Sequence, residues 1–199
     1  MTVWDTESNH IERFANIIPD QSLTSLATVD GLIVAGTMVF GGGGSSPTQK
    51  EAKLFLWDPD KKVKTWEGTP VPKAKRMTDF LTLPDGKIMG IAAPGAEGKG
   101  TLFVFDPRSR QTGLTLPFAW TPVYNSVALG NDGAVWGLAN EGIFRFDPQA
   151  RTLALVARTP QPVTAGFVLM DGALYFASGA TIYRYRLPQQ PERSPRSYQ

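Results

Sequence analysis

Four polar side chains with the chemistry of a ligand site lie in two short segments of the sequence. Arg76 and Asp79 belong to the first segment, and Tyr124 and Asn125 belong to the second. A guanidinium binds anions, a carboxylate and an amide oxygen ligate hard cations, and a phenol donates and accepts protons. If the fold brings the segments together, these groups predict a polar ligand site, an acid–base site or a cation site.

Two further residues extend this candidate set from neighbouring loops. Trp120 stands in the Pro-flanked segment PFAWTP, where its indole either stacks on a sugar ring or closes the gap between two repeats. Glu51 lies in a long loop over residues 40–52 and would have to swing in to add a third oxygen ligand for calcium or magnesium.

Charge near the first segment favours an acidic ligand. Lys73 and Lys75 stand beside Arg76, so a uronate or a phosphate is a candidate ligand class. The structural alternative is that Arg76 pairs with Asp79 and that the lysines form a solvated loop. Both interpretations stay open at this point.

An internal repeat supplies the elements that must position these residues. The segments LFLWDPDKKVKTW (54–66), LFVFDPRSRQTGL (102–114) and IFRFDPQARTLAL (143–155) match one another, and degenerate copies occupy 2–14 and 182–188. The aromatic residue before Asp-Pro recurs about every 40 to 50 residues. Such periodicity is typical of repeat folds.

Two turn signals mark each repeat. Asp-Gly between two apolar runs predicts a tight hairpin, and the pair occurs at 30–31, 85–86, 132–133 and 171–172. Asp-Pro predicts a second turn after the aromatic residue that precedes it, which we call the aromatic anchor. The aspartates of these Asp-Pro pairs are therefore turn residues rather than catalytic ones. The repeat thus predicts four antiparallel strands in roughly 40–45 residues, the unit of a β-propeller blade.

The predicted fold class is all-β, a propeller of four-stranded antiparallel blades, over residues 1–188. Residues 2–17 match the third and fourth strands of a blade, and 163–186 match the first three. The chain therefore either closes on itself with about four blades or is a fragment of a six- or seven-bladed propeller. We favour the fragment, because the sequence starts inside a repeat, and expect a disordered tail over 189–199.

The repeats resemble the NHL, SMP-30/gluconolactonase-like and virginiamycin B lyase-like propellers. The matching motifs are DGAVWGLANEGIFRFDP (132–148) and DGKIMGIA followed by LFVFDP, and the resemblance covers most of 24–186. It implies a divalent metal held by a carboxylate, Asn and Asp in SMP-30-like hydrolases, for which Asp79 and Asn125 have the right types. No Glu occupies an equivalent strand start, and His10 lies in a predicted turn far from the channel that houses a lyase histidine.

Composition excludes several classes of function. The chain of 199 residues has no cysteine and one histidine, which excludes disulfides, thiol nucleophiles and multi-histidine metal sites. A net charge of +2 argues against a nucleic-acid partner, and no apolar run is long enough to span a membrane.

The N-terminus does not resemble a signal peptide. We expect a soluble protein, and the sequence leaves its cellular compartment undecided. The glycines at 41–44 lack the Gly-Lys-Ser/Thr of a phosphate loop.

These observations predict a binding module. Its ligand, a small molecule, a carbohydrate or a protein partner, would contact the channel mouth and the loop over 40–52, and no cofactor is predicted. The alternative is a metal-assisted lactone hydrolase or lyase acting on a sugar-like substrate, which would use calcium or magnesium.

Overall fold

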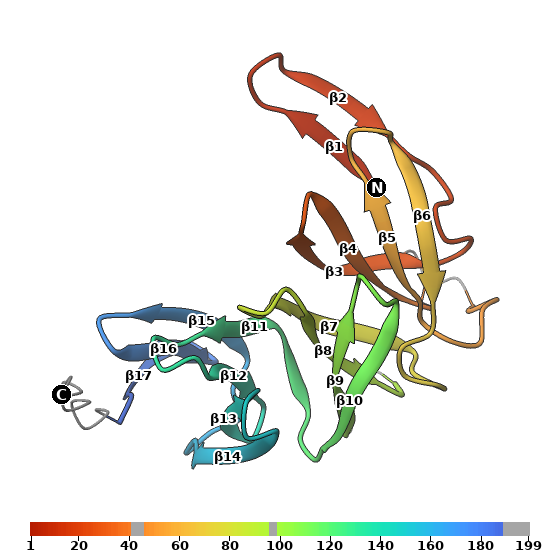
Figure 1. The fold of residues 1–199 in the computed structure, drawn as a ribbon. Helices are drawn as coiled ribbons and strands as arrows, with labels where there is room; N and C mark the ends of the chain where they lie inside the picture. Colours follow the sequence, from red (N-terminus) through yellow and green to blue (C-terminus); the bar gives the residue numbers. More distant parts are fainter. Residues whose placement is uncertain (41–45, 96–98, 189–199) are drawn as a thin grey trace, which may run out of the picture. The chain divides into compact units, whose positions relative to one another are not determined.

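The protein is all-β, as the repeats predict. In the computed structural model, seventeen strands and no helix make up the described residues, which are 1–40, 46–95 and 99–188 (Figure 1). The glycines at 41–44, residues 96–98 and the predicted tail over 189–199 lie outside them. The chain divides into two compact units, residues 1–125 and 126–199, and each is described by itself.

Three antiparallel repeats of four strands carry most of the strands; the first two join into one eight-stranded sheet, and the third is a separate four-stranded sheet. Repeat 1 contains β3 (Ser22–Val29), β4 (Leu32–Met38), β5 (Leu54–Asp58) and β6 (Val63–Gly68). Repeat 2 contains β7 (Arg76–Thr82), β8 (Ile88–Ala93), β9 (Gly100–Asp106) and β10 (Gln111–Phe118). Repeat 3 contains β11 (Pro122–Leu129), β12 (Val135–Ala139), β13 (Gly142–Asp147) and β14 (Thr152–Arg158).

Partial repeats stand at both ends of this series. The first is a hairpin of β1 (Thr2–Asp5) and β2 (His10–Arg13), and the last is a three-stranded sheet of β15 (Ala165–Met170), β16 (Ala173–Ser178) and β17 (Thr181–Arg186). Both have the strand content that the degenerate copies predict. Together with the three full repeats, these two partial repeats fit the prediction of about four blades.

The structure confirms the Asp-Gly hairpins. They take two forms, which differ in the number of residues between the end of the strand and Asp-Gly. Asp30 and Gly31 both have positive φ, 49° and 77°, which gives a two-residue turn between β3 and β4. Where two residues stand between the strand and Asp-Gly, as Leu83 and Pro84 do after β7, only the glycine has positive φ. The N–H of Gly86 then donates to the carbonyl of Leu83 at 2.9 Å, which closes a wider turn.

The aspartates after the aromatic anchors cap turns. Asp58, Asp106 and Asp147 each accept, through Oδ1, the N–H groups two and three residues further along. The N–H groups of Ala150 and Gln149 hold the pKa of Asp147 below its usual range, because they stabilise the ionised carboxylate. The structure therefore confirms the turn role predicted for these residues.

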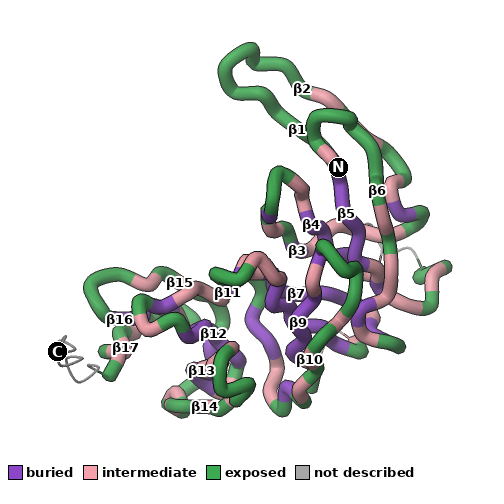
Figure 2. The backbone as a smooth tube through the Cα atoms, viewed as in Figure 1, coloured by how far each residue is buried: buried purple, intermediate pink, exposed green. Residues whose placement is uncertain are grey.

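The aromatic anchors fill the core of the complete repeats. Phe105 is 1% exposed and Phe146 is fully buried, and the Trp66 ring stacks on Phe105 with ring centroids 5.1 Å apart. Trp4 occupies the same repeat position in the β1–β2 hairpin and is 60% exposed. Figure 2 shows that hairpin exposed along nearly its whole length, since it forms a two-stranded sheet with no inner strands.

The anchors therefore predict a contrast in stability. Phe105→Ala and Phe146→Ala should each lower the free energy of unfolding by about 3–5 kcal/mol, because each leaves a cavity in a packed core. Trp4→Ala, the matched control at the same repeat position, should change it by less than about 0.5 kcal/mol. Urea denaturation followed by fluorescence measures both effects. A Phe146→Ala protein as stable as wild type would contradict the core assignment.

Candidate functional site

One edge of the sheet in the first unit brings chain segments far apart in sequence together. Ser22 at the start of β3 pairs with Met38 at the end of β4, and Met38 pairs in turn with Arg76 at the start of β7. Arg76 also pairs with Ala93 at the end of β8. We call this row of paired residues the mouth edge. The connections that enter β3 and β7 therefore meet the loop that leaves β4 (Figure 1).

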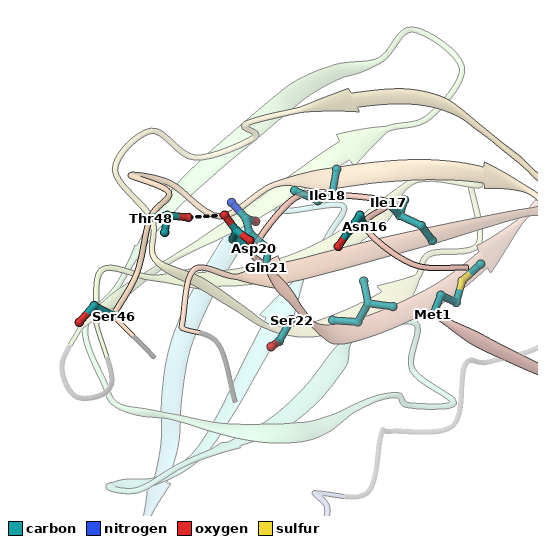
Figure 3. Close-up of a pocket in the computed structure, with 10 residues that line it drawn as sticks. Met1, Asn16, Ile17, Ile18, Asp20, Gln21, Ser22, Ser46 and Thr48 are labelled. Atoms are coloured by element: carbon teal, nitrogen blue, oxygen red, sulfur yellow. Dashed lines mark hydrogen bonds between the residues drawn. The ribbon is translucent and has the colours of Figure 1, made fainter. Parts of the chain in front are cut away.

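A pocket of about 320 Å³ lies at the β3 end of the mouth edge (Figure 3). Its wall comes from the segment that leads into β3 and from the loop after β4, which is the loop over 40–52 predicted to contact a ligand. The lining residues are Met1, Asn16, Ile17, Ile18, Asp20, Gln21, Ser22, Leu23, Ser46 and Thr48.

Hydrogen bonds fasten the two walls of the pocket to each other. Thr48 Oγ1 donates to Asp20 Oδ2 at 2.7 Å, and Gln21 Nε2 donates to the carbonyl of Glu51 at 2.7 Å. Thr37 Oγ1 in turn donates to Gln21 Oε1. Asn16 and Asp20 have φ of 54° and 55°, a left-handed backbone that Asn and Asp tolerate better than other residues. The pocket thus has a defined shape set by side chains as well as by strands.

At the β7 end of the mouth edge, the structure brings Arg76 and Tyr124 together. Arg76 Nη1 donates to the Tyr124 hydroxyl at 2.8 Å, and Arg76 Cζ lies 5.0 Å from the centroid of the tyrosine ring. Arg76 is only 5% exposed, whereas Tyr124 is 38% exposed. The guanidinium is therefore buried beside an accessible phenol, in hydrogen-bond and cation–π geometry.

Asp79 and Asn125, the predicted metal ligands, differ in burial. Asp79 is 1% exposed, and Asn125 is an exposed residue with φ of 51°. Among the described residues, no group of three or more His, Cys, Asp or Glu side chains is placed to hold a metal ion. A cation at Asp79 and Asn125 would therefore depend on oxygen donors other than a carboxylate cluster.

Glu51 and Trp120 make contacts within the protein. Glu51 Oε1 accepts the backbone N–H of Lys73 at 2.7 Å, which ties the loop over 40–52 to the connection before β7. Trp120 is half-buried, edge-on to Phe118 with ring centroids 5.3 Å apart. In this arrangement Glu51 does not reach toward Asp79 and Asn125, and Trp120 packs on its own repeat.

Sequence reasoning missed two polar clusters. The first is the pocket segment 16–22, for which the only sequence signal is the polar run after the apolar Ile17 and Ile18. The second lies in the second unit, where Arg145 Nη2 lies 3.1 Å from Asp132 Oδ2 and its guanidinium lies over the Trp136 ring. Trp136 is 4% exposed, so this second cluster seals the repeat rather than forming a site.

Solved structures with similar folds are propellers. The Dos1 propeller aligns with a TM-score of 0.65 at 14% identity, over 93% of this chain and 46% of its own. The extracellular domain of a protein assigned to the hybrid two-component systems of B. thetaiotaomicron gives 0.65 at 10% identity, over 97% and 27%. The fold is a β-propeller.

A gluconolactonase-like structure aligns with a TM-score of 0.53 at 15% identity, over 82% of this chain and 57% of its own. The chain spans about half or less of the length of the Dos1 propeller and of the B. thetaiotaomicron extracellular domain. At identities this low, the three alignments establish the fold alone. No protein-family model matches the sequence, and no curated protein matches it. None of the described residues forms a helix long and apolar enough to cross a membrane.

The burial of Asp79 generates a prediction for metals. Calcium or magnesium should leave the melting temperature unchanged, because one buried carboxylate and one amide give too few ligands for tight binding. Thermal denaturation with each cation against EDTA measures this. A cation-dependent rise that the Asp79→Asn/Asn125→Ala double variant loses would contradict the prediction and favour the hydrolase alternative.

Proposed function

We propose that this chain is a β-propeller binding module whose pocket takes a small, neutral, hydroxyl-rich ligand of the carbohydrate class. The observation that carries the proposal is the pocket itself, about 320 Å³ between the segment entering β3 and the loop leaving β4. This volume falls at the small end of the usual range for ligand pockets, roughly 300–1,000 Å³, and suits a single sugar ring.

The chemistry of the lining supports a sugar over other small molecules. The amide of Asn16 and the hydroxyls of Ser22 and Thr48 both donate and accept hydrogen bonds, as sugar hydroxyls do, whereas the Gln21 amide is held by Glu51 and Thr37. Asp20 adds a carboxylate, which accepts from the Thr48 hydroxyl through Oδ2 and can accept a ligand hydroxyl through its other oxygen.

Apolar side chains complete this match. Ile17, Ile18 and Leu23 also line the pocket, and they offer a surface for the C–H face of a sugar ring. Mixed polarity of this kind is poorly suited to a purely apolar or a highly charged ligand.

The second candidate function is a metal-assisted lactone hydrolase or lyase with a sugar-like substrate. It is favoured by the fold likeness to the gluconolactonase-like structure and by the residue types of Asp79 and Asn125. Against it, the described residues offer no carboxylate and histidine cluster of metal-ligand composition. The pocket supports binding without requiring a reaction, so we place binding first.

The test is a calorimetric titration of the whole chain with neutral monosaccharides and polyols. At least one should bind, and Thr48→Val and Asp20→Asn should each weaken that binding by about tenfold or more, because the first removes a hydroxyl and the second a charged acceptor from the pocket lining and from the hydrogen bond that joins its walls. Asn is chosen at position 20 because it tolerates the left-handed backbone there.

A matched control separates this effect from a change in net charge. Asp60→Asn removes one exposed carboxylate from the turn between β5 and β6 and should bind as wild type does. Absence of binding across the panel, or equal loss in Asp60→Asn, would overturn the proposal. Turnover of gluconolactone that depends on added calcium would favour the hydrolase.

A further inference from the structure

Asp20 carries the only acidic or basic side chain among the residues that line the pocket. Its Oδ2 accepts the Thr48 hydroxyl at 2.7 Å, and its backbone has φ of 55°, so the carboxylate is held from both ends. In the part of the chain that the structure describes, its other oxygen, Oδ1, accepts no hydrogen bond, and no cation pairs with it. The pocket therefore presents a fixed negative group with one oxygen available to a ligand.

The positive groups of the pocket walls do not neutralise Asp20. The amino group of Met1, which also lines the pocket, donates to the carbonyl of Phe14 at 2.8 Å. Figure 3 shows Met1 and Asp20 on opposite sides of the pocket. Lys50, two residues after Thr48, is exposed and forms no ion pair with any described residue. A ligand can therefore supply the cation that the walls do not.

An ammonium group on a sugar ring fits this arrangement better than a hydroxyl does. It has three donors and a full charge, and charge-assisted hydrogen bonds to a carboxylate are shorter and stronger than neutral ones. Replacing one ring hydroxyl by an ammonium leaves the ring size almost unchanged, so the volume of about 320 Å³ suits both. The remaining ring hydroxyls would still meet Asn16 and Ser22 in the lining.

We propose that the preferred ligand of this pocket is an amino sugar, whose ammonium group donates to Asp20. The inference rests on the proposed function and deepens it, because an amino sugar has the same hydroxyl-rich ring as its neutral parent and adds one charge. Asp20 is an exposed residue, and ion pairs at exposed positions are weak. The expected gain in affinity over the neutral parent is therefore about fivefold.

The experiment is a calorimetric titration of the whole chain with glucosamine and galactosamine, at a pH where the amines are protonated. Each is compared with its neutral parent sugar and with its N-acetyl derivative. At least one amino sugar should bind about fivefold more tightly than its parent, and acetylation should remove the gain because it removes the charge. Added sodium chloride should lower the affinity ratio of amino sugar to parent, because salt screens an exposed ion pair.

Variants test whether the gain comes from Asp20. Asp20→Asn keeps an acceptor for the Thr48 hydroxyl and loses the charge, so the affinity ratio should fall to about one. Asp60→Asn removes an exposed carboxylate from the turn between β5 and β6 and should keep the ratio of wild type. If Asp20→Asn fails to fold, the N-acetyl derivatives and the salt dependence carry the test on wild type.

The outcomes separate this inference from the proposed function. A neutral parent that binds as tightly as its amino sugar, or a ratio that Asp20→Asn retains, would overturn the inference and leave the sugar pocket in place. Absence of binding by both amino and neutral sugars would overturn the inference and the proposed function together. Binding of an amino sugar alone, lost in Asp20→Asn, would support the inference and replace the neutral ligand class.

Discussion

The second and third repeats of this protein depend on a close approach between an aromatic ring and a glycine on the neighbouring strand. Gly90 on β8 pairs with Phe103 on β9, and Gly137 on β12 pairs with Phe144 on β13. A Cβ added at either glycine would overlap the paired ring, so no other residue fits without displacement. Both rings are fully buried, which makes this contact the centre of these two repeats.

That contact also fixes where the polar residues at the mouth edge can lie. In the first unit, Phe80 packs edge-on against Phe103 with ring centroids 6.1 Å apart, and Met77 and Phe80 belong to one buried cluster with Phe103. Because β7 is held this way, its first residue, Arg76, is set in register with both β8 and β4. The rigid core thereby holds a buried guanidinium in place beside Tyr124.

Much of the fold follows from local sequence signals. The aromatic-Asp-Pro and Asp-Gly motifs give the strand order and the turns, since each acts through contacts within a few residues. The exposure of Trp4 does not follow from its motif, because burial at that position depends on inner strands that the β1–β2 hairpin lacks. The pocket was likewise not predicted from the sequence. It depends on the left-handed backbone at Asp20 and on a hydrogen bond to Thr48, which is 28 residues away in sequence.

The central claim is that the mouth edge is the binding face of this propeller module. The most direct measurement is an NMR titration of the ¹⁵N-labelled chain with the neutral monosaccharide or polyol that binds in the calorimetric test. The account predicts that amide shifts change at residues 16–23 and around Thr48, and that the turn after Asp147 stays unchanged. Shift changes confined to the Asp-Gly or Asp-Pro turns, or no change at all, would contradict it.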